Sequence, residues 1–349
     1  MRTSEGSGAV VLAAYQPNPA LFAVQLRSIR DQTRSDFRCL VGADGGQAEV
    51  RTLVDGAVGD DPRFEVIGWD DNLGFYLNFE RLLRMVPDDV AWVALSDQDD
   101  RWYPDKLERL VPLLDDAMLA TGQARVISWP GGETLLDRTR RRVVPATDLI
   151  FENQVTGALS VIRRELLETA LPFPRLHTVT QLHDHWLALC AVTVGEYGVL
   201  DDVVQDYVQH GGNLVGDRGQ RHPRSPRKLW HLITSLADEY EGAHDVASCL
   251  RACQVLSFGW RREMTRTLRD RVFSGTAEIA STWALFARPG AGTTGRLLTH
   301  ACRSPNVQAS VAATFVAGTP GEVLLACGWD SRGHRKSHDH ARTLRKSRP

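Results

Sequence analysis

Short apolar runs alternate with longer amphipathic runs over the first third of the chain, and this alternation restricts the fold most strongly. The apolar runs are typical of strands at Ala9–Ala14, Phe37–Gly42, Phe64–Trp69 and Val90–Leu95. The amphipathic runs are typical of helices at Pro19–Asp31, Phe75–Val86 and Pro104–Leu114. Strands that alternate with helices build a mainly parallel sheet covered by helices. The sequence therefore predicts an α/β fold of Rossmann-like architecture.

Polar segments follow three of the expected strands. They are GADGG at 42–46, DDNLG at 70–74 and SDQDD at 96–100. In open α/β sheets the ligand crevice lies outside the carboxyl ends of the strands. We therefore expect the functional site where these three segments meet.

The segment SDQDD brings three carboxylates into four positions, at Asp97, Asp99 and Asp100. Neighbouring carboxylates repel one another, and a hard cation such as Mg²⁺ or Mn²⁺ relieves that repulsion through oxygen ligands. A second interpretation is a helix N-cap, because an acidic turn before a helix is stabilised by the helix dipole. The residues alone leave both interpretations open.

The pattern changes after Arg125 and again near residue 220. Strands are expected at Val126–Trp129, Gly157–Ile162, Glu196–Leu200 and Val203–Val208, with a helix at His183–Val194. The Arg- and Pro-rich patch RGQRHPRSPRK at 218–228 then precedes runs that look helical from Leu229 to about Ala287. We expect one domain over 1–220, a mainly helical extension over 221–330 and a basic tail over 331–349.

Charge and composition restrict the partners and the location of the chain. The 349 residues have a formal net charge of −2, which gives no general attraction to nucleic acid. The tail over 331–349 holds seven Lys or Arg residues and one acid, and we expect it to be solvated and disordered, with contact to an anionic membrane surface as the alternative.

No transmembrane span is expected, because the most apolar run, Ala309–Cys327, is interrupted by TPGE at 319–322. The segment MRTSEGSGAV lacks the apolar core of a signal peptide, and the six cysteines form no CxxC pair. These features favour a cytoplasmic location, with peripheral contact at the inner face of the membrane left open.

The segment SDQDDRWYPDKLERL resembles the rhamnosyltransferase-like members of glycosyltransferase family 2, in which a strand ends in Asp-x-Asp followed by Asp, an aromatic residue, Pro, Asp and Lys. Other segments resemble the family in the same order. They are AAYQPNPALFAVQLRSIRDQT, GADGG, DDNLGFYLNFERLL, TGALSVIRREL, LHDHWLALCA and VVQDYVQHGGN. The resemblance covers residues 9 to 216 and implies a GT-A fold. It also implies a hexosyltransferase that moves a sugar from a nucleotide-sugar donor and inverts the configuration at the anomeric carbon. The favoured donors are dTDP-rhamnose and a UDP-sugar.

The resemblance assigns the donor side of the site. Asp44 would accept hydrogen bonds from the base or the ribose, although an Asp before two glycines is also a common turn residue. Asn72 and Gly74 would shape the loop beside the nucleotide, where glycine permits close backbone approach. Asp97 would bind the ribose, and Asp99 would ligate Mn²⁺ or Mg²⁺.

The resemblance also assigns the acceptor side. Asp184 would be the base that takes the proton from the acceptor hydroxyl, although an Asp at a helix start is also a common N-cap. His183 stands where the family usually has the first residue of a pair ending in Asp, so its role is left open. His210 would reach the metal or the diphosphate, and a structural histidine is the alternative. The expected acceptor-binding residues are Thr156, Gly157, His183 and Trp186. The acceptor would be a hydroxyl of a polysaccharide, a glycolipid or a natural product.

Three other classes of protein share parts of this pattern. A nicotinamide-dependent dehydrogenase would carry G-x-G-x-x-G after the first strand, where this chain has AAYQPNP. A nucleotidyltransferase would carry a glycine-rich phosphate loop and a basic residue in the same region, and neither is present. A non-catalytic nucleotide-sugar-binding or scaffold protein stays open as the alternative, because binding residues alone do not prove turnover.

Overall fold

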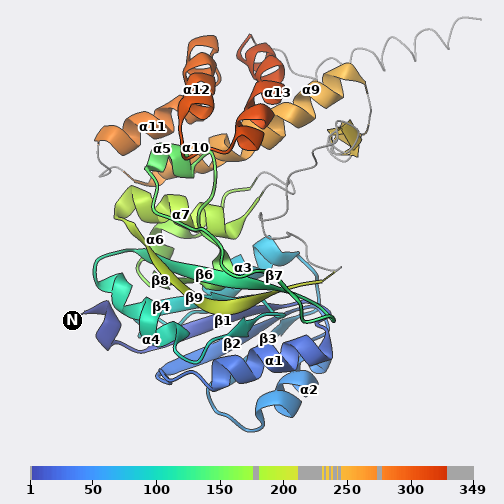
Figure 1. Ribbon diagram of the computed structural model, residues 1–349, viewed down its shortest axis with the longest axis vertical. Coiled ribbons are helices and arrows are strands. Elements are labelled where there is room, and N and C mark those ends of the chain that lie inside the picture. Colours follow the sequence, from blue (N-terminus) through green and yellow to red (C-terminus); the bar gives the residue numbers. More distant parts are fainter. Residues whose placement is uncertain are drawn as a thin grey trace, which may run out of the picture. The chain divides into compact units, whose positions relative to one another are not determined.

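A nine-stranded sheet forms the centre of the described part of the first 210 residues. The computed structural model describes residues 2–175, 181–210 and 230–327, without 232, 236, 239–241, 243–244 and 273–276. The strands are β1 Gly8–Ala14, β2 Phe37–Asp44, β3 Phe64–Trp69, β4 Trp92–Ser96, β5 Arg101–Trp102, β6 Leu119–Ser128, β7 Thr134–Leu136, β8 Ser160–Arg163 and β9 Tyr197–Gln209. Their order is β3-β2-β1-β4-β8-β6-β9-β5, and β7 pairs with β6 (Figure 1).

The first four strands are parallel, and β1 lies between β2 and β4. All but one of the residues of β1 are buried, as expected for a central strand covered on both faces. Strand β8 is antiparallel to both β4 and β6, so the second half of the sheet is mixed. The carboxyl ends of β1, β2 and β4 therefore meet at one edge, directly before Tyr15, Gly45 and Asp97.

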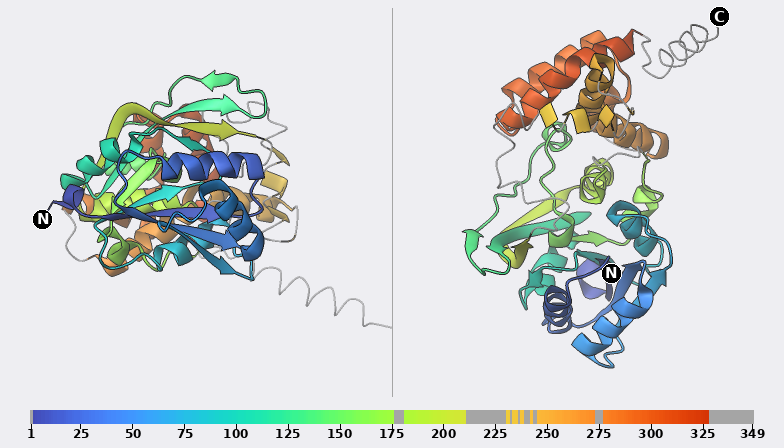
Figure 2. Two further views of the ribbon diagram at one scale, coloured as in Figure 1. Left: turned by 90° about the horizontal axis from the view of Figure 1, so that it is seen from below. Right: turned by 90° about the vertical axis from the view of Figure 1, so that its right-hand side faces the viewer.

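Helices cover both faces of this sheet. They are α1 Pro19–Arg30, α2 Gln47–Val58, α3 Phe75–Leu83, α4 Lys106–Leu110, α5 Ala146–Leu149, α6 Leu166–Ala170 and α7 His183–Val194. Helices α1 and α2 lie on one face, and α3, α6 and α7 lie on the other (Figures 1 and 2). Helix α1 begins where the Asn18 side chain accepts hydrogen bonds from the backbone N–H groups of Ala20 and Leu21. The layered architecture agrees with the α/β fold expected from the sequence.

Several expected elements have different limits in the structure. The helix expected at Pro104–Leu114 is α4 followed by a 3-10 helix, Val111–Asp115, because Pro112 has no backbone N–H to continue the α-helical pattern. The two strands expected at 196–200 and 203–208 form the single strand β9. The strand expected from Gly157 begins at Ser160, after a 3-10 turn at Gly157–Leu159.

A second compact unit is formed mainly by residues after 220 and is helical in its described part. Its helices are α9 Val246–Gln254, a π-helix Val255–Gly259, α10 Trp260–Arg271, α11 Ala277–Ala287, α12 Ala291–Arg303 and α13 Ala309–Ala326. The sequence pattern did not indicate α12 and α13. The patch 218–228, expected as a domain boundary, and the basic tail 331–349 lie outside the described residues.

Helix α13 differs from the sequence expectation, because it continues through Pro320. Among the described residues it is the one helix long and apolar enough to cross a membrane, with a mean hydropathy of 1.3 over 18 residues. One such helix is weak evidence for a span, since core helices of other proteins meet the same criterion.

Gly8 and Trp92 pack directly against each other in the core of the first unit. A Cβ atom at residue 8 would lie 2.2 Å from the Trp92 ring, whose indole N–H donates to the Gly6 carbonyl at 2.9 Å. We expect Gly8→Ala to lower the free energy of unfolding by about 1–3 kcal/mol, because the fully buried ring has no room to move. The measurement is the urea midpoint of unfolding.

Gly56 provides the matched control for this substitution. It lies inside α2, and a Cβ atom there would meet nothing within 4 Å. Gly56→Ala should raise the free energy of unfolding by up to about 1 kcal/mol through helix propensity. Equal effects of the two substitutions would contradict the packing argument.

Candidate functional site

A cavity of about 560 Å³ lies at the edge of the sheet where the three polar segments meet. Its lining includes nine of the residues that the sequence analysis singled out. They are Asp44, Asn72, Gly74, Asp97, Asp99, Thr156, Gly157, His183 and Asp184. These residues come from segments far apart in the sequence, and the strand order brings them together.

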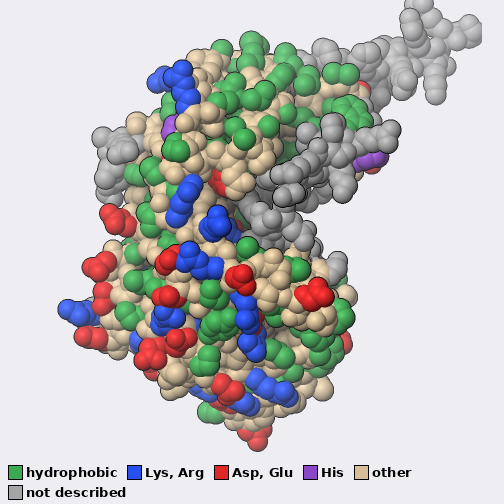
Figure 3. Space-filling model, viewed as in Figure 1, with side chains coloured by type: hydrophobic (Ala, Val, Ile, Leu, Met, Phe, Trp, Pro, Cys, Tyr) green, Lys and Arg blue, Asp and Glu red, His purple; other side chains and the backbone are tan. Residues whose placement is uncertain are grey.

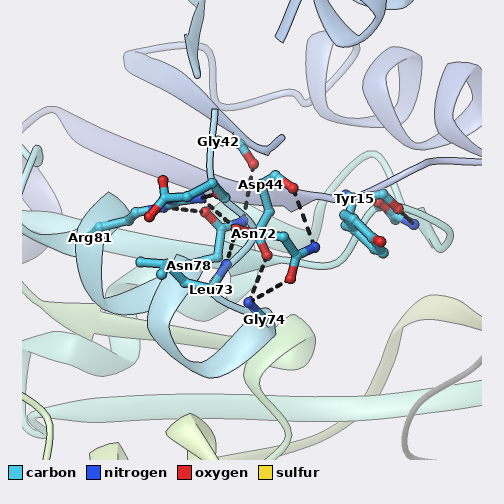
Figure 4. Close-up of polar contacts among 10 residues, drawn as sticks. Tyr15, Gly42, Asp44, Asn72, Leu73, Gly74, Asn78 and Arg81 are labelled. Atoms are coloured by element: carbon cyan, nitrogen blue, oxygen red, sulfur yellow. Dashed lines mark hydrogen bonds and ion pairs between the residues drawn. The ribbon is translucent and has the colours of Figure 1, made fainter. Parts of the chain in front are cut away.

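One wall of the cavity is built around Asp44 at the end of β2 (Figure 4). Its carboxylate is buried and accepts hydrogen bonds from the backbone N–H groups of Leu73 and Gly74, both at 2.9 Å. The Asn72 side chain donates to the Asp44 carbonyl at 3.4 Å and accepts from the Gly74 N–H at 3.1 Å. Gly74 has a positive φ of 79°, so the loop needs glycine at this position. Asp44 therefore fixes the loop over Asn72–Gly74 as part of the cavity wall.

Arg81 on α3 holds Asp44 from outside the cavity lining (Figure 4). Its guanidinium forms an ion pair with the Asp44 carboxylate, and its Nε donates to the Asn78 side chain at 3.0 Å. The guanidinium also lies 3.9 Å from the centre of the Trp69 ring. With side-chain exposures of 12% for Arg81 and 2% for Asp44, this is a largely desolvated pair. Three donors therefore already occupy the carboxylate that was expected to bind the nucleoside.

The acidic turn after β4 forms a second wall. Gln98 ties this turn to the end of β1, because its side chain accepts from the Tyr15 N–H at 2.7 Å and donates to the Tyr15 carbonyl at 3.1 Å. Burial and the charges of Asp99 and Asp184 raise the pKa of Asp97 to about 7. The carboxylates of Asp97, Asp99 and Asp184 therefore share one region of the cavity, and added positive charge there would stabilise their ionised forms.

Beneath the turn, Lys106 is fully buried. Its ammonium donates to the Ala158 carbonyl at 2.5 Å and to the Gln205 side chain at 2.6 Å, and it lies 3.7 Å from the centre of the Trp102 ring. Gln205 in turn donates to Asp100 at 2.7 Å. Burial lowers the pKa of Lys106 well below its usual value, and the charges of Asp100 and Asp97 oppose that shift. This network connects the acidic turn, β9 and the segment before β8.

Asp99 and His210 approach each other at the cavity. The His210 Nε2 lies 2.7 Å from the Asp99 Oδ2, and both side chains are about one-fifth exposed or less. Within the described residues no group of three or more His, Cys, Asp or Glu side chains is arranged to hold a metal ion. A carboxylate and an imidazole are nevertheless both ligands that divalent cations accept. The pair therefore fits part of a metal site, which a bound diphosphate and water could complete.

Asp184 and His183 begin α7 and also line the cavity. Asp184 lies in the first helical turn, where the helix dipole stabilises a carboxylate. His183 stacks on Phe79 with ring centres 4.0 Å apart, and neither of its ring nitrogens has a hydrogen-bond partner. Burial lowers the pKa of His183, so the imidazole is neutral. A Cβ atom at Gly157 would lie 2.3 Å from the His183 Nε2, so any larger residue there would displace the imidazole.

The structure does not bring Trp186 to the cavity. Its ring is fully buried, and its indole N–H donates to the Ala170 carbonyl at 2.9 Å. Trp186 follows Asp184 by two positions, and this spacing places it on another face of α7, in the core.

Sequence reasoning missed Gln98, Arg81, Lys106 and Gln205 as supports of the cavity. Gln98 and Lys106 lie inside the motif SDQDDRWYPDK, and this position beside the acidic residues could have identified them from the sequence. No pattern in the sequence connects Arg81 with Asp44 or Gln205 with Asp100, because these pairs form only across the folded sheet.

Residues 10–170 match the sequence model of a family described as Glycosyl transferase family 2. No curated protein matches the chain in sequence. Among solved structures, S. aureus TarS 1–349 in complex with UDP-GlcNAc is 13% identical, with a TM-score of 0.48, over 95% of this chain and 92% of that one. The mannosyltransferase PcManGT from Pyrobaculum calidifontis, in complex with GDP-Man and Mn²⁺, is 16% identical, with a TM-score of 0.46, over 91% and 87%. The match to a longer S. aureus TarS structure covers 90% of this chain and 53% of that one.

Removing Arg81 should loosen the wall around Asp44. We expect Arg81→Met to lower the free energy of unfolding by about 3 kcal/mol, because it leaves a buried carboxylate without its cation. Chemical denaturation measures this effect. Arg38→Met is the control, since the Arg38–Asp89 pair is exposed on both sides and should contribute only about 0–1 kcal/mol. Adding Asp44→Asn to Arg81→Met should recover part of the lost free energy of unfolding. If the effects of the two substitutions simply add, the two side chains do not interact.

His183 should make the fold sensitive to acid. Its pKa is lowered in the folded state, so below its unfolded pKa of about 6.5 the unfolded chain binds a proton that the folded chain does not. The free energy of unfolding should then fall by up to about 1.4 kcal/mol per pH unit between pH 6.5 and the folded pKa. His183→Phe should remove this contribution, measured as the urea midpoint at pH 7 and pH 5. An unchanged pH slope in the variant would rule out this role.

Proposed function

We propose that this chain, whose residues 10–170 belong to glycosyl transferase family 2 and fold into a GT-A-like sheet, transfers a sugar from a nucleotide-sugar donor to a hydroxyl acceptor. One observation carries the proposal. The acidic turn with Asp97 and Asp99 lines the same cavity as Asp184, although α7 follows that turn only after β5 to β8. A donor diphosphate and an acceptor hydroxyl could therefore meet in one cavity.

On the donor side, the wall around Asp44 receives the nucleoside. Because Asp44 already accepts three hydrogen bonds, its main task in this proposal is to hold Asn72 and Gly74 in place. The remaining acceptor capacity of its Oδ2 faces the base. Asp97 accepts hydrogen bonds from the ribose hydroxyls. These assignments follow the family resemblance and the position of each side chain in the cavity lining.

Asp99 and His210 would hold Mn²⁺ or Mg²⁺. The fit rests on the 2.7 Å approach of their ligand atoms and on the crowding of carboxylates that raises the pKa of Asp97. When bound, such a cation stabilises the negative charge of a leaving diphosphate. Lys106 and Gln98 keep the acidic turn in position for this role.

Asp184 acts as the base. As the acceptor oxygen attacks the anomeric carbon, its proton passes to the Asp184 carboxylate, and the bond from that carbon to the diphosphate oxygen breaks on the opposite face. The configuration at the anomeric carbon therefore inverts. Helix α7 supports the charged form of Asp184 before the reaction, and the apolar ring stack of Phe79 and His183 excludes water beside it. Thr156 and Gly157 form the floor under the acceptor.

The donor and acceptor follow the family resemblance. A dTDP-rhamnose or UDP-sugar donor and a hydroxyl of a polysaccharide, glycolipid or natural product fit a rhamnosyltransferase-like hexosyltransferase. Residues 1–220 form the transferase domain in this proposal, and 221–330 form its helical extension. A cytoplasmic location is supported by six free cysteines, of which four are buried.

Donor hydrolysis and sugar transfer by the purified protein test the proposal. We expect turnover in the presence of Mn²⁺, loss of turnover with EDTA and recovery when Mn²⁺ or Mg²⁺ is restored. Asp184→Asn should lower kcat by about 10²–10⁴-fold with little change in donor binding, because it removes only the base. Asp99→Asn should weaken both metal and donor binding.

The control variant is Asp105→Asn, an exposed acid on the same segment that does not line the cavity. It should keep full turnover. Full activity in EDTA would remove the metal role of Asp99 and His210, and full activity of Asp184→Asn would remove the base. Donor binding without any turnover would favour the alternative of a non-catalytic nucleotide-sugar-binding or scaffold protein.

A further inference from the structure

The last residues of α10 belong to the first unit. Helix α10 starts in the helical unit, but Asp270 and Arg271 group with the residues of the sheet. The sequence analysis placed the limit of the first domain at residue 220, and Arg271 lies well beyond that limit along the chain. The first unit therefore includes a side chain that the sequence assigned to the extension.

The Arg271 guanidinium donates to three backbone carbonyls. Its Nη1 donates to the Thr169 carbonyl at 2.8 Å and to the Ala170 carbonyl at 3.1 Å, and its Nη2 donates to the Pro172 carbonyl. Thr169 and Ala170 end α6, and the last carbonyls of a helix have no partner within it. On the face of the first unit seen in Figure 3, acidic and basic side chains are interspersed over the surface. Arg271 instead closes the end of a helix, where a cation is favourable.

Trp186 of α7 binds one of the same carbonyls. Its indole N–H donates to Ala170 at 2.9 Å, and its ring is fully buried. The Arg271 guanidinium lies 5.6 Å from the centre of that ring, within the range of an attractive cation–π contact. Asp184 precedes Trp186 by two positions, in the first turn of α7. The contacts that fix Trp186 therefore also fix the backbone that carries Asp184.

Groups of α3 and α7 also lie close to the guanidinium. Burial lowers the pKa of Arg271, and the nearby Cys190 thiol and Glu80 carboxylate oppose that shift. Glu80 belongs to α3 and Cys190 to α7. The Tyr76 hydroxyl of α3 donates to the Pro174 carbonyl at 2.8 Å, so α3 holds the same segment after α6 that Arg271 holds. Arg271 therefore lies where α3, α6 and α7 come together.

We propose that Arg271 is a positioning residue for sugar transfer and holds the first turn of α7 so that Asp184 faces the acceptor hydroxyl. The guanidinium acts through Ala170 and Trp186. Among the described residues that line the cavity Arg271 is not present, so it touches no substrate in this assignment. A base must lie within hydrogen-bond reach of the proton it takes, and a displacement of about 1 Å lowers the rate by up to about 10²-fold. This inference rests on the proposed function, because it adds a residue to that site.

Steady-state kinetics and hydrogen exchange of the full chain test the proposal together. Arg271→Met removes the guanidinium and keeps an apolar stem. We expect kcat to fall about 10–100-fold with the donor KM unchanged, because the donor side of the cavity keeps its own contacts. The backbone amides of residues 184–190 should exchange faster, since the first turn of α7 loses its anchor. Arg271→Lys keeps the charge but not the planar fork of donors, and it should recover part of kcat.

Arg261→Met is the matched control on the same helix. The Arg261 guanidinium lies 4.9 Å from the centre of the Phe315 ring and donates to the carbonyls of Leu256 and Ser257, at 3.3 and 3.1 Å. These are the same kinds of contact, but all of them lie within the second unit. Arg261→Met should therefore leave kcat and the exchange of α7 unchanged.

Equal kcat values for Arg271→Met and the unchanged chain would overturn the proposal, as would unchanged exchange of α7. An equal loss of kcat in Arg261→Met would also overturn it, because the effect would then not depend on α7. If circular dichroism shows that Arg271→Met is unfolded, Arg271→Lys decides by the same two measurements. If the unchanged chain itself shows no turnover, the proposed function fails and this inference fails with it. Turnover that is insensitive to Arg271 overturns this inference alone.

Discussion

The arrangement of the cavity depends on a buried lysine beneath a group of carboxylates. Lys106 reaches the Ala158 carbonyl and the Gln205 side chain, and Gln205 reaches Asp100. Without a cation below it, a turn that carries Asp97, Asp99 and Asp100 would accumulate unopposed negative charge in a largely desolvated place. The same ammonium also holds the segment before β8, which contains Thr156 and Gly157, the residues proposed to lie under the acceptor. One side chain therefore connects the donor and acceptor sides of the proposed site.

A similar principle operates in the wall formed by Asp44. A carboxylate that is almost fully buried is stable only if donors surround it, and here Arg81 and two backbone N–H groups do so. The consequence is a rigid loop over Asn72–Gly74. The acids of this cavity therefore divide between two tasks. Asp44 and Asp100 accept several hydrogen bonds from the protein itself, whereas Asp97, Asp99 and Asp184 line the cavity and are the acids that the proposed function assigns to the ligands.

The two parts of the chain divide their charges as well as their folds. Residues 1–220 carry 21 Lys or Arg and 33 Asp or Glu and contain the mixed sheet and the cavity, whereas residues 221–349 carry 20 Lys or Arg and 10 Asp or Glu. A phosphate-bearing donor and a net-negative domain are compatible only if cations act locally. Arg81 compensates the charge of Asp44, and in the proposed function the metal at Asp99 would supply positive charge where the diphosphate needs it.

The sequence by itself determined the first four parallel strands and the helices α1, α3 and α7, since apolar runs and helical periodicity report burial locally, but it did not indicate α2 or β7. It also determined that acidic and glycine-rich segments follow those strands, and the strand order then brought nine of the expected residues to one cavity. Only the tertiary structure decided what each residue does there. Trp186 entered the core, Asp44 was occupied by Arg81, and Pro320 was included in α13, because these outcomes depend on neighbours that are distant in the sequence. Hydrogen bonds, ion pairs and close packing form between such neighbours, and no local pattern in a chain contains them.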